Sequence, residues 1–289
     1  MQEAPLISPR PHSPAMDALL GARHPVLDHG FIRVIDYMGD DAAVVQAARV
    51  SYGEGTKTVS DDRALIRYLM RNRHTSPFEM CEIKVHVRLP LFVARQWIRH
   101  RTANVNEVSG RYSILSKEFY IPAPADISAQ STNNKQGREE TPLSMEEAEK
   151  VTQVLRSACD SAYSSYEELL EEHSLARELA RMVLPTNVYT EWYWKVDLHN
   201  LLHFLKLRNH PHAQREMRNY AETLYRIVAK WVPLSAEAFQ DYQIDARLFS
   251  KQELDVLRAW LQGQSVSLKT CGLSARELAE LESLMGLRL

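Results

Sequence analysis

The chain has little glycine, few cysteines, almost no net charge and no long apolar run. Only 10 of its 289 residues are glycine, about half of the roughly 7% found in average proteins, which disfavours a glycine-rich β sandwich or a low-complexity chain. The net charge of −2 excludes a global field that would attract nucleic acid or an acidic membrane surface. No stretch approaches the roughly 18 consecutive apolar residues of a membrane span. We therefore expect neither nucleic acid nor membrane as a partner.

The cysteines are few and widely spaced, and they form no CxxC pair. They are Cys81, Cys159 and Cys271. An odd, scattered set argues against a disulfide framework and for a reducing compartment. The N-terminus lacks the basic and then apolar pattern of a signal peptide, so we expect a cytoplasmic protein.

Helical periodicity interrupted by short strands is what the sequence does contain. The clearest strand is 81–89, where five apolar residues alternate with four polar ones. Further strands are expected at 30–36, 112–121 and 187–195. Helices are expected at 40–51, after an N-cap at Ser60, and at 91–99, 145–172, 174–183, 197–208 and 212–232. This pattern predicts a helix-rich α+β fold with a central, mostly antiparallel sheet.

Three segments lie outside this pattern. Residues 1–27 are proline-rich and aperiodic and are expected to form a flexible N-terminal arm. Residues 123–143 are rich in polar residues and proline and predict a loop or partly mobile insertion. Residues 246–289 predict an appended C-terminal helical hairpin, because they contain two capping-box patterns, Ser250 with Glu253 and Ser274 with Glu277.

The densest polar segment is RQWIRHRTANVNEVSGRY, residues 95–112, which contains four arginines. It lies where a helix is expected to pass into a loop. Because arginine offers a planar fork for bidentate contact with phosphate, and because loop amides and hydroxyls accompany it, the segment suits a bound phosphate. A solvated basic face with a turn is the alternative.

A second candidate is DLHNLLHFLKLR, residues 197–208. His199 and His203 are four residues apart and lie on one helical face. Such a pair can bind zinc, but the zinc-protease motif needs a glutamate directly after the first histidine, and Asn200 stands there. The other alternative is that both histidines are ordinary helix residues that bind no ligand. The segment HTSPFE at 74–79 predicts only a turn when taken alone.

Arg99-His100-Arg101, followed by seven residues and then Ser109, resembles the diagnostic motif of the flavin-dependent thymidylate synthases. Relatives often carry Ser where Asn104 stands. The resemblance covers about residues 28–243 and leaves out the arm, the insertion near 126–143 and the tail. Further similar blocks are ARVSY (48–52), HTSPFE (74–79), FVARQW (92–97), EFYIP (118–122), ARMVLP (180–185), DLHNLLHFLKLR (197–208) and HAQREMRNYA (212–221).

The resemblance implies a catalytic domain over residues 28–245 that converts dUMP to dTMP in de novo dTMP biosynthesis. In that family 5,10-methylenetetrahydrofolate donates the carbon and NADPH the reducing equivalents. FAD is the cofactor, reduced FAD delivers the hydride, and no protein nucleophile forms a covalent bond. The family also implies a homotetramer whose active sites form where subunits meet. No metal is implied.

Matching positions carry the family's site residues onto this chain. Arg208 is implied as catalytic, because a fixed cation near the uracil favours ionisation at N3 and makes C5 more nucleophilic. Ser109 is expected to bind rather than attack, since no general base stands beside it. His74 and Glu79 are possible further members of the flavin site. FAD contacts are implied for Ser76, Arg99, His100, Arg101, Glu107, Asp197, His199 and His203, and dUMP contacts for Gln96, Arg99, Ser109, Gly110, Arg111, Arg181 and Arg208.

Three other classes of protein compete with this hypothesis. A zinc hydrolase built on the paired histidines lacks its acid. A nucleic-acid-binding module is disfavoured by the sequence pI of about 6.6 and by the absence of a recognised motif. The classical thymidylate synthase, of unrelated design, needs an activated cysteine, and Cys81 on a buried strand face, Cys159 within a helix and Cys271 in the tail do not match that requirement.

Overall fold

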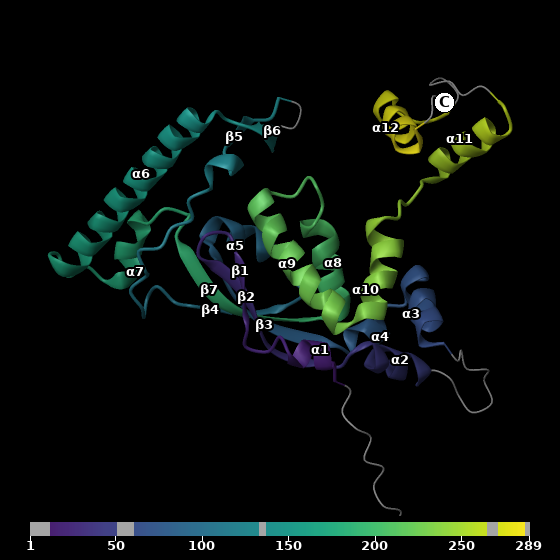
Figure 1. Ribbon diagram of the computed structural model, residues 1–289, viewed down its shortest axis with the longest axis horizontal. Helices are drawn as coiled ribbons and strands as arrows, with labels where there is room; N and C mark the ends of the chain where they lie inside the picture. The colour runs from purple at the N-terminus through teal and green to yellow at the C-terminus, as the bar shows by residue number, and fades with distance from the viewer. Residues whose placement is uncertain (1–11, 51–60, 133–136, 265–270, 287–289) are drawn as a thin grey trace, which may run out of the picture. The chain divides into compact units, whose positions relative to one another are not determined.

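The computed structural model describes residues 12–50, 61–132, 137–264 and 271–286 (Figure 1). The predicted N-cap Ser60 lies outside the described residues. The chain divides into two compact units, with the boundary between Phe239 and Gln240. This boundary falls a few residues before residue 246, where the tail was predicted to begin. None of the described helices combines the length and the apolar character that a membrane crossing requires.

A five-stranded sheet forms the centre of the first unit. Its order is β1-β2-β3-β7-β4, and every neighbouring pair is antiparallel, which confirms the predicted mostly antiparallel sheet. The strands are β1 (Arg23–Val26), β2 (Gly30–Met38), β3 (Glu82–Pro90), β7 (Tyr189–Asp197) and β4 (Asn104–Glu107). Strands β3 and β7 pair along their whole length, from Glu82↔Asp197 to Pro90↔Tyr189.

One face of this sheet is covered by three helices, α5 (Leu91–Trp97), α8 (Leu198–Arg208) and α9 (Arg215–Trp231) (Figure 1). Trp97 at the end of α5 is fully buried. Its ring centroid lies 5.2 Å from that of Trp194 on β7, 4.7 Å from Phe204 on α8 and 6.1 Å from Tyr220 on α9. One side chain therefore joins the sheet to all three helices, two residues before Arg99.

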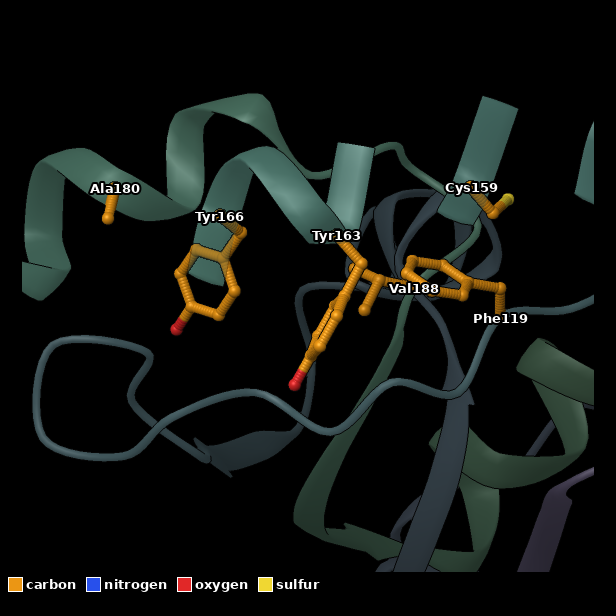
Figure 2. Close-up of a cluster of buried hydrophobic side chains, with 6 residues drawn as sticks. All are labelled: Phe119, Cys159, Tyr163, Tyr166, Ala180 and Val188. Carbon is orange, nitrogen blue, oxygen red and sulfur yellow. The ribbon is translucent and has the colours of Figure 1, made fainter. Parts of the chain in front are cut away.

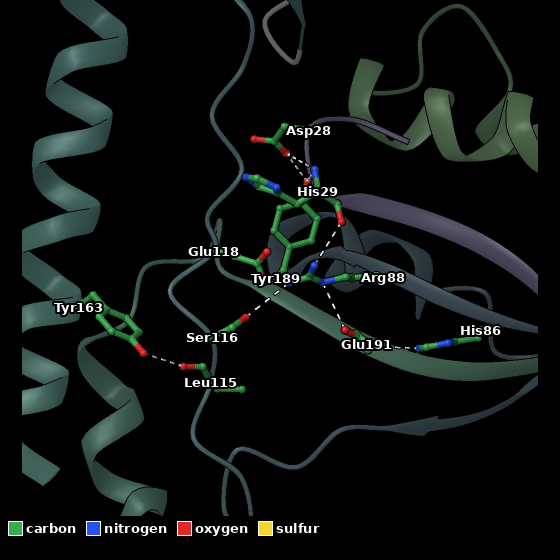
Figure 3. A network of polar contacts seen from close by, with 10 residues as sticks. All are labelled: Asp28, His29, His86, Arg88, Leu115, Ser116, Glu118, Tyr163, Tyr189 and Glu191. Carbon is green, nitrogen blue, oxygen red and sulfur yellow. Dashed lines mark hydrogen bonds and ion pairs between the residues drawn. The ribbon is translucent and has the colours of Figure 1, made fainter. Parts of the chain in front are cut away.

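The other face of the sheet carries a polar network (Figure 3). Arg88 on β3 forms ion pairs with Glu118 and with Glu191 on β7. Arg33 donates a hydrogen bond to Nδ1 of His86 at 2.8 Å, and Nε2 of the same ring lies 2.8 Å from Glu191. Because a guanidinium can only donate, Nε2 carries the proton and donates to Glu191. The network ties β2, β3 and β7 to the segment around Glu118.

Helix α6 (Met145–Glu171) holds the same segment through a separate apolar cluster (Figure 2). Tyr163 donates a hydrogen bond to the carbonyl of Leu115 at 3.1 Å, and the amide of Leu115 donates to the hydroxyl of Tyr166 at 3.4 Å. The cluster is formed by Phe119, Cys159, Tyr163, Tyr166, Ala180 and Val188. It positions the loop after Ser109 and the chain that precedes Arg181.

The remaining elements of the first unit are short. They are α1 (Pro14–Asp17), α2 (Asp41–Arg49), α3 (Asp62–Arg71), α4 (Ser76–Glu79), the 3₁₀ turn η1 (Pro124–Asp126), β5 (Ser128–Gln130), β6 (Arg138–Pro142), α7 (Arg177–Ala180), the 3₁₀ turn η2 (Arg181–Val183) and α10 (Pro233–Phe239). The helix predicted at 174–183 is therefore shorter than expected and ends as a 3₁₀ turn.

The prediction of a strand at 112–121 was wrong, because the structure has no β-strand among these described residues. The residues after Ser109 begin with a turn, in which the amides of Tyr112 and Ser113 both donate to the Ser109 carbonyl at 3.1 Å. Of this segment, Phe119 makes an isolated bridge to Val188. The partner of β7 on that side is the polar strand β4, which the sequence analysis did not identify.

Two other predicted segments are more ordered than expected. In the predicted arm, residues 12–27 contain α1 and the edge strand β1, and Met16 is fully buried; residues 1–11 lie outside the described residues. In the predicted insertion, β5 and β6 form a two-stranded sheet. Arg138 on β6 forms a 2.5 Å ion pair with the buried Glu216 of α9, so long-range contacts that local composition does not reveal hold the described part in place.

The second unit is a helical hairpin, as predicted. It contains the π-helical turn η3 (Gln240–Ile244), α11 (Lys251–Leu261) and α12 (Ala275–Met285). Both predicted capping boxes are present, at Ser250 with Glu253 and at Ser274 with Glu277. Val256, Leu273 and Leu281 form its small buried core.

We expect a chain that ends at Asp245 to fold and to bind flavin. The first unit contains the whole five-stranded sheet and its helices, and the caps of α11 and α12 are formed within the tail itself. Circular dichroism with thermal unfolding measures the fold, and flavin absorbance of the purified protein measures the site. Loss of bound FAD with the fold intact would show that the tail builds part of the site.

Candidate functional site

An open cavity of about 410 Å³ lies between the loop after α5 and helix α8. Six of the sequence-predicted site residues meet there, although roughly one hundred positions separate the two segments. The lining is formed by Arg99, His100, Arg101, Thr102, His199, Asn200, His203, Phe204, Leu207 and Arg208. The two candidate segments identified in the sequence therefore form one site.

The orientation of α8 follows from its first turn. Asp197, the last residue of β7, caps the helix by accepting hydrogen bonds from the backbone amide of Asn200 at 2.9 Å and from its side chain at 2.7 Å. Phe204 faces Trp97 in the core. With the helix fixed at these two points, His199 and His203 line the cavity, as expected for residues four apart.

Positive charge is concentrated in this cavity. Burial lowers the pKa of Arg208, and the neighbouring Arg99 lowers it further. The Arg208 guanidinium donates a 3.0 Å hydrogen bond to the backbone carbonyl of Gln96. Among the described residues, no carboxylate forms an ion pair with Arg99, Arg101 or Arg208. A group of arginines without an internal counter-ion suits an anionic ligand.

His100 lies at the centre of this charge. Burial lowers the pKa of its imidazole, the charges of His203 and Arg208 lower it further, and Asp197 opposes them. The ring centroid of His100 lies 5.8 Å from that of His203, and the Thr102 hydroxyl is 3.0 Å from Nε2 of His100. The donors fit a cofactor that carries a pyrophosphate, as FAD does.

A smaller cavity of about 220 Å³ shares His100 and Arg101 with the first. Its walls include Trp97 at the end of α5 and Trp192 and Trp194 on β7. The indole nitrogens of Trp97 and Trp192 are buried, and neither has a hydrogen-bond partner among the described residues. Only the three-dimensional packing reveals that these three indoles line a cavity, because they come from a helix and a strand about one hundred residues apart.

A second group of predicted residues lies elsewhere on the chain. Arg111 forms an ion pair with Glu178 at 3.1 Å, and Arg181 donates to the Glu178 backbone carbonyl at 3.3 Å. Gly110 is buried so close to Arg181 that a Cβ would lie 3.3 Å from its Cδ. Ser109 accepts a hydrogen bond from the Arg111 amide at 3.3 Å. None of these four predicted dUMP residues belongs to the described lining of the cavity. Within one chain, the residues predicted to bind dUMP therefore fall into two separate groups.

The other predicted residues do not belong to the described lining of the cavity. Glu107 on β4 accepts a 2.6 Å hydrogen bond from Thr190. Ser76 and Glu79 stand at the two ends of α4, which packs against α8, and the ring of His74 contacts Tyr68. Gln96 donates from its side chain to Gln214.

Cys81 does not offer an activated thiolate. Burial, assisted by the charges of Asp40 and Asp41, raises the pKa of Cys81 to about 12, so its thiol stays protonated at neutral pH. Cys159 is buried on α6 beside Asn187. Across the ranges that the structure describes, no group of three or more His, Cys, Asp or Glu side chains gathers in a way that would hold a metal.

The chain is similar to known proteins over most of its length. The family described as thymidylate synthase complementing protein matches residues 33–234. A flavin-dependent thymidylate synthase of Ruegeria pomeroyi is 60% identical over 277 residues, covering 95% of this chain and 91% of that protein. One from Gluconobacter oxydans is 56% identical over 283 residues, covering 97% and 93%.

Solved structures agree with the sequence relatives. A UMP/dUMP methylase from Streptomyces cacaoi bound with 5-Br UMP superposes with a TM-score of 0.68 at 36% identity, over 75% of this chain and 96% of that one. The matched family region contains most of β2, the whole of β3, β4 and β7, the cavity and both groups of predicted residues. The chain therefore belongs to the flavin-dependent thymidylate synthase family.

Proposed function

We propose that this chain catalyses the reductive methylation of dUMP to dTMP with FAD as its cofactor, in de novo dTMP biosynthesis. 5,10-Methylenetetrahydrofolate is the proposed carbon donor and NADPH the proposed reductant, and the cytoplasm is the proposed location. The observation that carries the proposal is the cavity in which Arg99, His100 and Arg101 meet His199, His203 and Arg208. These are the residues that the family motif and the α8 segment contribute.

The cationic cavity supplies what two anionic ligands need. Arg99, Arg101 and the three histidines offer hydrogen-bond donors and charge for the FAD pyrophosphate and its surroundings. When bound, FAD supplies the hydride that reduces the transferred one-carbon unit to a methyl group. The protein's contribution is therefore binding, orientation and charge.

Arg208 is proposed to act on the uracil. The Gln96 carbonyl holds its guanidinium at 3.0 Å, and an arginine stays charged in proteins. A fixed cation beside the pyrimidine stabilises negative charge that develops on the ring and makes C5 a better nucleophile. Burial and Arg99 lower the pKa of Arg208, so an anion at this position relieves repulsion between the two guanidinium groups.

The divided dUMP set supports a homotetramer with active sites between subunits. Ser109, Gly110, Arg111 and Arg181 form one group, while Gln96, Arg99 and Arg208 belong to the other. Exposed apolar side chains flank the first group: Tyr112 is 76% exposed and Met182 is 72% exposed. Such side chains suit contact with another subunit, and in the proposed tetramer the first group of one protomer meets the cavity of the next.

The visible spectrum of the purified protein tests the proposed function directly. We expect flavin absorption bands that bleach with NADPH, and dTMP as the product when dUMP and 5,10-methylenetetrahydrofolate are added. The measurements are absorbance and chromatographic identification of the nucleotide. A folded protein that stays colourless after incubation with FAD would overturn the proposal.

A comparison of two variants tests the absence of a protein nucleophile. We expect replacement of Cys81, Cys159 and Cys271 together by Ala to preserve dTMP formation, because the Cys81 thiol is protonated at neutral pH. Arg208→Ala should lower turnover by about 10²–10³, since one preorganised charge at a developing anion contributes roughly 3–4 kcal/mol. Turnover is measured in FAD-loaded protein. Its loss in the folded triple variant would restore a covalent thiol route.

FAD binding is expected to tighten as the pH falls. In the free protein the pKa of His100 lies below the usual value, because of burial and then the charges of His203 and Arg208. A phosphate anion in the cavity favours the imidazolium and raises that pKa, so binding takes up a proton. Affinity then rises as the pH drops through the pKa of the bound state and levels off below the pKa of the free state.

FAD titrations between about pH 8 and pH 5.5, the range where histidine titrates, measure this dependence. His100→Gln should flatten it, whereas His210→Gln, outside the cavity lining, should leave it unchanged. An equal slope in wild type and His100→Gln would exclude His100 as the group that takes up the proton.

A further inference from the structure

A chain of polar side chains runs from the buried start of α9 to Gln96. Glu216, the second residue of α9, is only 4% exposed. Its Oε1 accepts hydrogen bonds from Arg138 at 2.5 Å and from the Tyr120 hydroxyl at 3.2 Å. Its Oε2 accepts from the side-chain amide of Gln214 at 2.8 Å. Gln214 in turn accepts from the side-chain amide of Gln96.

Glu216 is ionised in this setting. Burial alone would raise its pKa, but hydrogen bonds from Arg138, from its own backbone amide and from Gln214 lower it overall. An ionised carboxylate can only accept hydrogen bonds. Gln214 must therefore turn its NH₂ group toward Glu216.

The orientation of the Gln214 amide in turn determines the orientation of the Gln96 amide. With its NH₂ group on Glu216, Gln214 presents its carbonyl oxygen to Gln96. An oxygen acceptor requires a donor opposite, so Gln96 must turn its own NH₂ group toward Gln214. The carbonyl oxygen of the Gln96 side chain is left at the other end of that amide, and no described residue donates a hydrogen bond to it. Replacing the carboxylate by a group that also donates would remove the reason for this orientation.

Gln96 connects this chain of amides to the cavity. Its backbone carbonyl accepts the hydrogen bond from Arg208, the cavity arginine proposed to act on the uracil. We propose that Glu216 and Gln214 are positioning residues, which orient the Gln96 amide so that its carbonyl oxygen accepts a hydrogen bond from bound dUMP. The inference rests on the proposed function, since dUMP is the ligand it concerns. Neutral donors of dUMP are N3–H of the uracil and the 3′-hydroxyl of the sugar.

The test compares dUMP with two analogues, each lacking one of these donors, in FAD-loaded protein. The 3′-deoxy analogue lacks the hydroxyl, and the N3-methyl analogue lacks the N–H. Wild type is expected to bind one of them about three- to tenfold more weakly than dUMP, the effect of one neutral hydrogen bond. Gln214→Leu, which keeps the side-chain bulk but cannot hold the amide, should reduce this ratio toward one.

Tyr120→Phe is the matched control. It removes a hydrogen bond to the same carboxylate, but at Oε1 instead of Oε2, so the arm through Gln214 and Gln96 stays intact. Its dUMP-to-analogue ratio should stay within about twofold of wild type. Glu216→Gln is a second test variant, because a neutral amide can face either end of the Gln214 amide. The ratio of dUMP affinity to analogue affinity should also fall toward one in this variant.

Three results would contradict the inference, and a fourth would contradict the proposed function. Equal affinity of wild type for dUMP and both analogues would overturn the inference, as would full discrimination retained in Gln214→Leu. A Gln214→Leu protein that binds all three nucleotides more weakly by the same factor has only lost structural support, and that also overturns it. Failure of wild type to bind dUMP would instead refute the proposed function.

Discussion

The site depends on the packing of Trp97 between the sheet and helices α8 and α9. Its ring packs against Trp194, Phe204 and Tyr220, which belong to the sheet, to α8 and to α9. A tryptophan buries a large apolar surface in a defined orientation, and interiors as closely packed as this one allow little displacement. Because Arg99 follows two residues later, the same contact that joins sheet and helices also determines where the arginine loop begins relative to α8.

On this framework the protein holds charges that repel one another. Arg99 and Arg208 face one cavity, and the pKa of Arg208 is lowered by burial and further by the charge of Arg99. The folded state tolerates this arrangement because helix α8 is fixed elsewhere, by its Asp197 cap and by Phe204. The repulsion becomes useful once an anion binds, since a ligand that binds only the folded state stabilises it. The site therefore has electrostatic free energy available for phosphate and for negative charge on the substrate.

The sequence predicted those parts of the fold whose determinants are local. The alternation in 81–89 led to β3 within a residue, and Asp197 capped the expected helix. The segment 112–121 failed for the opposite reason: Leu115 finds its partners in Tyr163 and Tyr166, about fifty residues away, and no local pattern contains them. Strand β4 was missed because its sequence, NVNE, is polar and every residue is exposed. The family motif and the α8 segment named six residues that line the larger cavity, whereas the smaller, indole-lined cavity depends on packing alone.

The same distinction explains why the roles of Gln214 and Glu216 are not evident in the sequence. A glutamine and a glutamate at the start of a helix are ordinary residues, and in isolation the glutamate only complements the helix dipole. Their significance comes from Tyr120 and Arg138, which meet the carboxylate from other segments, and from Gln96, which meets the amide from α5. Arg138 belongs to the segment predicted to be a loop or a partly mobile insertion, yet it supplies the charge that keeps Glu216 ionised inside the protein. A residue of the segment that local composition marks as a loop thus helps to set the hydrogen-bonding direction of Gln96 on α5.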